Sequence, residues 1–224
     1  MRIYLTSQQV LSFRKEGVAE FLNGLTANDM DAPQNAFLTF HGRIVATCAQ
    51  LAKSSQEYYL CVEKDYVPPL LTHLDRYIKL GGIQVTSLPL RVYHDMDNTY
   101  QPADADVIPL SAGRLVLTEE SPDLTVGEEE YRLFRLQNGL PVQGIDYRDE
   151  MLLNVDPTRL VSFTKGCFLG QEPIAKVHNR SKPTWRLVVK DVTSCSPQEL
   201  AKMTSRTTDP ADHREYGFVF EQND

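Results

Sequence analysis

The chain has 224 residues, of which 42% are hydrophobic and 24% charged, a balance typical of one large or two small globular domains. Its net charge of -7 argues against duplex nucleic-acid binding, which needs a basic footprint. It contains no run of about 18 apolar residues, so we expect no membrane span, and the short apolar start is typical of a strand rather than a signal peptide. We therefore expect a cytoplasmic protein whose four cysteines remain reduced.

The first half of the chain has the pattern of antiparallel strands with two helices. We expect strands over residues 3–5, 10–13, 36–40, 43–51, 57–62 and 83–88. The spacing of apolar residues predicts a helix over 18–25 and another that begins at Asp65 and is stopped by Gly81 and Gly82. This order of elements favours an α+β sandwich of the split βαβ kind.

The second half is more irregular. Strands are expected over 90–93 and 113–118, around an exposed acidic connection, and again over 185–192 and 216–220. Three glutamates open a helix predicted to end near Asn138, with Gly139 as its stop. Residues 139–157 are expected to form a long, mostly irregular segment before residue 165, of the kind often used as a binding loop. The polar stretch 194–212 is expected to be loose.

The most distinctive stretch is Lys165-Gly166-Cys167-Phe168-Leu169-Gly170-Gln171-Glu172. Residues 165–190 carry six Lys or Arg and a single acid, Glu172, although the whole chain is acidic. Such an island is a candidate anion site, and its cations favour the thiolate form of Cys167. The two glycines suit backbone that takes positive φ or approaches a ligand closely. The alternative is a buried, inert cysteine beside a solvated basic face.

This octapeptide resembles the signature of the YgfZ-type folate-binding family, whose mitochondrial relatives are iron–sulfur cluster assembly factors. The T proteins of the glycine cleavage system are its distant cousins. Four further segments resemble the same family, and with them the resemblance covers residues 1 to about 190. These segments are residues 21–30, 136–141, 161–164 and 175–178.

The resemblance implies tetrahydrofolate, or a derivative, as the ligand. It implies chemical roles for Cys167 and Lys165. Basic side chains of the motif region, including Lys176, could bind the anionic folate tail, and Gln171 and Glu172 could bind the pterin or hold the loop. The Asn28-Asp29 pair is more typical of a turn than of a ligand contact. The candidate cofactor contacts are Gly166, Gly170, Gln171, Glu172, His178, Arg180, Gln137 and Asn28.

For the fold, the resemblance implies two interleaved ferredoxin-like lobes of antiparallel sheets with flanking helices. Residues 1–48 with 140–192 would form the motif lobe, and residues 49–139 the second lobe. The family's C-terminal barrel is expected to be missing or reduced, with residues 193–224 as a remnant.

Three functions follow from the resemblance. The first is a folate-dependent accessory factor in assembly or repair of iron–sulfur proteins, with client or assembly proteins as partners. The second is an aminomethyltransferase. Two departures argue against it: Ala46 and Thr47 stand at positions where the T proteins have acidic residues, and Gln137 stands where the family has Glu. The third is a folate-binding module without chemistry. Turnover by this chain is left open.

Overall fold

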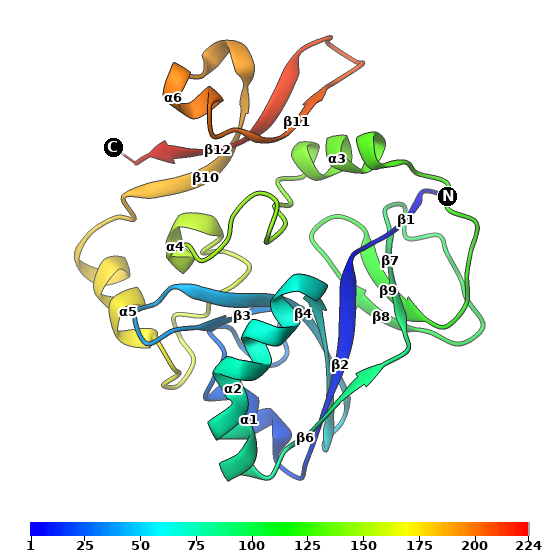
Figure 1. Cartoon of the computed structure of the whole chain (residues 1–224), viewed down its shortest axis with the longest axis vertical. Coiled ribbons are helices and arrows are strands. Elements are labelled where there is room, and N and C mark those ends of the chain that lie inside the picture. The colour runs from blue at the N-terminus through cyan, green and yellow to red at the C-terminus, as the bar shows by residue number, and fades with distance from the viewer. Residues whose placement is uncertain (224) are drawn as a thin grey trace.

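The computed structural model describes residues 1–223, which form an α+β protein with three antiparallel sheets (Figure 1). The largest sheet has the strand order β3-β4-β5-β2-β6. Helix α1 (Val18–Asn23) and helix α2 (Val67–Gly81) pack their apolar residues against it in one hydrophobic core. Its strands are β2 (Gln8–Arg14), β3 (Gln34–Leu38), β4 (Ile44–Ser54), β5 (Glu57–Glu63) and β6 (Gln84–Leu88).

A four-stranded sheet, in the order β1-β7-β9-β8, packs against the five-stranded sheet. A shared core of apolar side chains, among them Val10 and Cys61 from one sheet and Val92 and Leu115 from the other, fills the space between them. Alternation of side chains along the strands puts these residues on one face. The strands are β1 (Ile3–Leu5), β7 (Arg91–Asp95), β8 (Asp106–Pro109) and β9 (Arg114–Thr118).

The third sheet is built from the last part of the chain and has the order β10-β12-β11. The expectation that residues 194–212 are loose was wrong. They contain the short helix α6 (Pro197–Leu200), which is held by a reciprocal capping box between Ser196 and Glu199, and strand β11. The other elements of this region are β10 (Trp185–Asp191), η2 (Val192–Ser194), β11 (Thr204–Thr208) and β12 (Glu215–Gln222).

The remaining helices connect these sheets. They are η1 (Lys64–Tyr66), α3 (Glu128–Gln137), α4 (Leu152–Val155) and α5 (Gln171–Arg180). Helix α2 ends at Gly82, which has a φ of 64°, and α3 covers nearly the residues predicted for it. Within residues 1–223, no helix combines the length and apolar character that crossing a bilayer would require. The division into two lobes stays a prediction, and the five-stranded sheet contains strands from both sides of residue 48.

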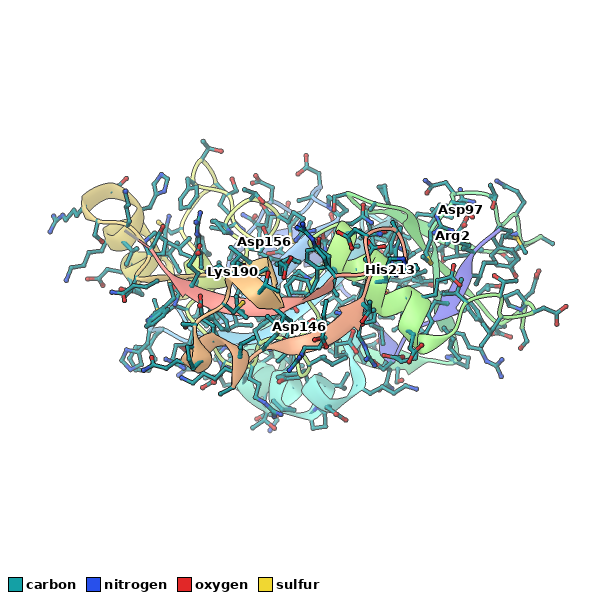
Figure 2. All side chains as sticks on the ribbon, turned by 90° about the horizontal axis from the view of Figure 1, so that it is seen from above. Arg2, Asp97, Asp146, Asp156, Lys190 and His213 are labelled. Carbon is teal, nitrogen blue, oxygen red and sulfur yellow. The ribbon has the colours of Figure 1, made fainter. Side chains whose placement is uncertain are left out.

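Two opposite sides of the molecule carry different parts of the chain. Figure 2 shows Arg2 and Asp97 together at one end, where Arg2 Nη2 lies 2.7 Å from Asp97 Oδ1 and ties the start of β1 to the turn after β7. Figure 1 shows α5 at the opposite edge, beside β3. The start of β1 and the helix that follows the KGCFLGQE stretch therefore lie on opposite sides of the molecule.

Candidate functional site

The loop that carries Cys167 packs against the segment that follows α1. Leu169 N donates to Gly24 O at 3.0 Å, and Ser162 N donates to Ala27 O at 3.0 Å. Three of the segments that resemble the YgfZ-type family are therefore in direct contact, since residues 161–164 and the octapeptide both bond to residues 21–30. These backbone hydrogen bonds fix the loop without using any motif side chain.

Lys165 completes this contact from its side chain. Its Nζ donates to Thr26 O at 2.8 Å and to Asn28 O at 2.6 Å, and lies 5.3 Å from the centre of the Phe168 ring. Burial lowers the pKa of Lys165 to about 8, and the nearby Asp29 carboxylate opposes this shift. In this position the main role of Lys165 is structural, because its side chain holds the loop against residues 26–28.

Replacing Lys165 with methionine is expected to lower the free energy of unfolding by about 1–3 kcal/mol, because two carbonyls lose their donor. The loss should depend on pH. The pKa of Lys165 is lower in the folded protein than in the unfolded chain, so wild-type stability gains as pH rises from about 8 to about 10. Urea unfolding at pH 7 and pH 9.5, with exposed Lys176→Met as control, measures this, and a difference independent of pH would contradict it.

Asn28, a candidate cofactor contact, is buried and engaged in structural hydrogen bonds. Its Nδ2 donates to Gln34 O at 3.0 Å and to Arg159 O at 2.9 Å, while its backbone N donates to Asn35 Oδ1 at 2.7 Å. The side-chain oxygen accepts from Asp29 N. These contacts give Asn28 a structural role at the centre of the turn. A turn residue and a ligand contact are the two alternatives that the sequence allows.

The two motif glycines have different environments. Gly170 precedes α5, has a φ of 84°, and lies so close to Thr39 that a Cβ would be 2.4 Å from the carbonyl oxygen. Gly166 is exposed, with open space where a Cβ would be. Gln171 is the half-buried first residue of α5, and Glu172 is exposed in its first turn, where its charge favours the helix dipole.

Cys167 is exposed at the surface rather than buried. On the same segment, the ring of His178 stacks on Phe163 with centroids 3.6 Å apart, and Arg180 is exposed at the end of α5. Gln137 lies elsewhere: it is exposed on α3, and its Nε2 donates to Asp209 Oδ2 at 2.9 Å. The structure thus gathers the motif residues but does not bring Gln137 to them.

A cavity of about 320 Å³ lies between the N-terminal strands, α3 and the loop after it, and none of the candidate site residues lines it. The sequence-based reasoning missed its polar residues because they come from separate elements. One signal in the sequence could have indicated the cavity: Glu63 is an acidic residue at the end of a largely apolar strand. Polar lining residues include Gln8, Thr47, Glu63, Tyr131, Arg135, Gln143 and Tyr147.

Thr47 is one of the two residues that the resemblance places at acidic positions of the T proteins, and it lines the cavity. Its backbone N donates to Gln143 Oε1 at 2.8 Å, and its hydroxyl lies 2.9 Å from the hydroxyl of Tyr147. Ala46 instead lies in the hydrophobic core. The cavity wall at this point is therefore neutral, because burial also raises the pKa of Tyr147 above its ordinary value.

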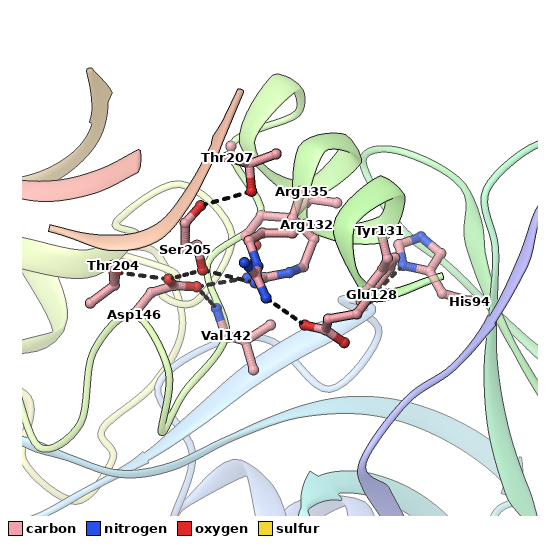
Figure 3. A network of polar contacts seen from close by, with 12 residues as sticks. His94, Glu128, Tyr131, Arg132, Arg135, Val142, Asp146, Thr204, Ser205 and Thr207 are labelled. Atoms are coloured by element: carbon pink, nitrogen blue, oxygen red, sulfur yellow. Dashed lines mark hydrogen bonds and ion pairs between the residues drawn. The ribbon is translucent and has the colours of Figure 1, made fainter. Parts of the chain in front are cut away.

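A buried ion pair joins the cavity wall to the C-terminal sheet (Figure 3). Arg135 Nη1 lies 2.7 Å from Asp146 Oδ2, and both side chains are almost completely buried. Thr204 and Ser205 donate their hydroxyls to Asp146 Oδ1 at 2.8 and 2.6 Å, and Val142 N donates to Oδ2 at 2.9 Å. The carboxylate thereby connects α3, the loop after it, and β11.

No protein-family model matches the chain. Curated proteins do match it. A mitochondrial iron–sulfur cluster assembly factor IBA57 homolog of Neurospora crassa is 25% identical over 79% of this chain and 50% of its own length. An uncharacterized protein of Haemophilus influenzae is 27% identical over 80% of this chain and 69% of its own.

Among solved structures, the glycine cleavage system aminomethyltransferase T of Bartonella henselae has the same fold. Its TM-score is 0.76 over 98% of this chain and 78% of that one, at 13% sequence identity. The chain is related to the YgfZ-type family. It spans about half the length of the Neurospora crassa relative. The YgfZ-type resemblance predicted from the KGCFLGQE stretch is confirmed by these matches, and the likeness to the aminomethyltransferase is one of fold.

Proposed function

We propose that this protein is a tetrahydrofolate-binding accessory factor in the assembly or repair of iron–sulfur proteins. The observation that carries the proposal is Cys167, an exposed thiol on a loop that backbone hydrogen bonds and Lys165 hold in place. The name of the Neurospora crassa relative supports a role in cluster assembly. An exposed thiol is accessible to a partner protein, and in this proposal Cys167 contacts that partner directly through its sulfur.

The folate would occupy the cavity rather than the surface around Cys167. A volume of about 320 Å³ is within the range of small-molecule sites, and the lining combines apolar walls with a few polar groups. Aromatic rings at Tyr131 and Tyr147 suit a flat heterocycle. When bound, a reduced folate would supply a carrier for one-carbon units, and the residues of the cavity would hold and orient its ring.

An assembly role ranks above aminomethyl transfer because of the residue at position 47. A general base for an amine needs a titratable group, and the Thr47 hydroxyl, which lies 2.9 Å from the Tyr147 hydroxyl, is not one near neutral pH. The motif residues do not line the cavity, so the thiol and the proposed folate site act as separate centres. We place this activity in the cytoplasm, with iron–sulfur client or assembly proteins as partners.

Cys167→Ala is expected to leave tetrahydrofolate affinity within about twofold of wild type, since Cys167 does not line the cavity. In cells that lack the endogenous protein, the same variant should fail to restore the activity of iron–sulfur enzymes. Calorimetry and an aconitase-type assay measure the two effects, with Cys195→Ala, a half-buried cysteine in the C-terminal region, as control. Full restoration by Cys167→Ala would contradict the proposed role of the thiol.

A further inference from the structure

Two hydrogen-bond acceptors lie side by side on the cavity wall. Gln8 of β2 and Glu63 of β5 are directly paired across the two antiparallel strands, and both line the cavity. The Oε1 of Gln8 is buried and has no hydrogen-bond partner in the described part of the chain. A buried amide oxygen without a donor is unfavourable, and this pairing therefore points to a ligand that supplies one.

Glu63 adds a carboxylate that no cation neutralises. The Ser7 hydroxyl donates to its Oε2, and the ion pairs formed within residues 1–223 include none with Glu63. Burial raises the pKa of the Glu63 carboxyl, while contacts with Ser7 and Gln8 and the charge of Arg135 oppose the rise. The carboxylate thus lies in a partly desolvated position where a donor would be strongly bound.

The cations of the cavity are already engaged. Arg135 is paired with Asp146 at 2.7 Å, and Arg159 is paired with Asp156. Both arginines also donate to backbone carbonyls, Arg135 to Leu140 O and Arg159 to Gly139 O. The uncompensated charge that faces the cavity is therefore negative, which favours N–H donors and disfavours a carboxylate-bearing group inside it.

We propose that Gln8 and Glu63 form an acceptor pair that binds an edge with two adjacent N–H donors, as in a cyclic guanidine or 2-amino-4-oxo pyrimidine ring. This inference rests on the proposed function, because such an edge belongs to the pterin ring of folates. It assigns the ring to the strands β2 and β5, and it leaves the anionic tail outside the cavity. Gln137, which the sequence offered as a candidate contact, does not line this cavity, and its Nε2 donates to Asp209 Oδ2.

The test is calorimetric titration of the full chain with three probes: tetrahydrofolate, a methylated tetrahydropterin without the tail, and p-aminobenzoylglutamate without the ring. In Glu63→Gln, the affinity for both ring-bearing probes should fall roughly ten- to a hundredfold, the usual effect of losing a charge-assisted hydrogen bond. Gln8→Met removes the orphan acceptor at similar size, together with the side-chain hydrogen bond to Glu63, and should weaken the same two probes by about fivefold. Neither variant should change binding of p-aminobenzoylglutamate.

The matched control is Glu57→Gln. Glu57 lies at the other end of β5 and also accepts from a serine, Ser12 Oγ at 2.6 Å, but it does not line the cavity. Its substitution should leave all three affinities unchanged. Circular dichroism of each variant establishes that the fold is retained.

The outcomes separate this inference from the proposed function. Tetrahydrofolate binding that survives Glu63→Gln and Gln8→Met unchanged overturns the acceptor pair and leaves the folate proposal standing. Loss of tetrahydropterin binding in Glu63→Gln, in a protein that never binds tetrahydrofolate, supports the acceptor pair and contradicts the folate proposal. A wild-type protein that binds neither ring-bearing probe overturns both.

Discussion

Replacing Asp146 with alanine is expected to lower the free energy of unfolding by about 3–5 kcal/mol, because the change leaves the buried Arg135 charge without its partner. The same carboxylate also accepts from Thr204, Ser205 and Val142, so three further donors lose their acceptor. Urea denaturation followed by circular dichroism measures the loss. Hydrogen exchange in β11 should accelerate more than in β5, because the contact to the C-terminal sheet is the one removed.

Asp149→Ala is the control for this experiment. Asp149 lies three residues further along the same loop and forms an ion pair with Arg43 at 3.3 Å, but its side chain is 75% exposed. Exposed pairs contribute little, so a change of at most about 0.5 kcal/mol is expected. A loss below about 1 kcal/mol in Asp146→Ala would mean that the buried network does not hold the C-terminal sheet.

Gly170→Ala is expected to cost about 2–4 kcal/mol of stability and to displace the motif loop. The φ of 84° at Gly170 is strained for alanine, and the added Cβ would lie 2.4 Å from the backbone oxygen of Thr39. Since Leu169 and Lys165 hold the same loop to residues 24–28, its displacement should also expose those contacts. Thermal unfolding and the rate of alkylation of Cys167 together measure the effect.

Gly166→Ala provides the matched comparison within the same motif. Gly166 does not have positive φ, and the space where its Cβ would be is open, so a change within about 0.5 kcal/mol is expected. Equal losses in the two variants would show that the backbone geometry at Gly170 is not what the motif requires.

The sequence predicted well where local chemistry determines the structure. Helix α2 ends at the glycines that were expected to stop it, and α3 begins at its three glutamates, because caps and charges near helix ends act over a single turn. It predicted poorly where the deciding contact is distant in the chain. The strand β11 has little periodic apolar character, and it forms by pairing with β12 and by donating to Asp146.

The candidate site shows the same limit. Lys165 and Asn28 were both identified from the sequence, yet their contact of 2.6 Å joins positions 137 residues apart and could not be read from either segment. The cavity was missed for the related reason that Gln8 and Glu63 meet only through strand pairing. A side chain's residue type indicates its chemistry, whereas its partners depend on the register of the sheet.

The ion pair between Arg135 and Asp146 also bears on how the chain matures during synthesis. The hydroxyl groups that complete the shell around Asp146 belong to residues 58 and 59 positions later, Thr204 and Ser205. During synthesis, the strands that line the cavity therefore precede β11, and the hydrogen bonds around Asp146 are completed only once β11 has been synthesised. Translation that stalls before β11 would release a polypeptide in which the Asp146 carboxylate lacks two of its donors and the pocket wall lacks its support, and such fragments are natural targets of chaperones and proteases.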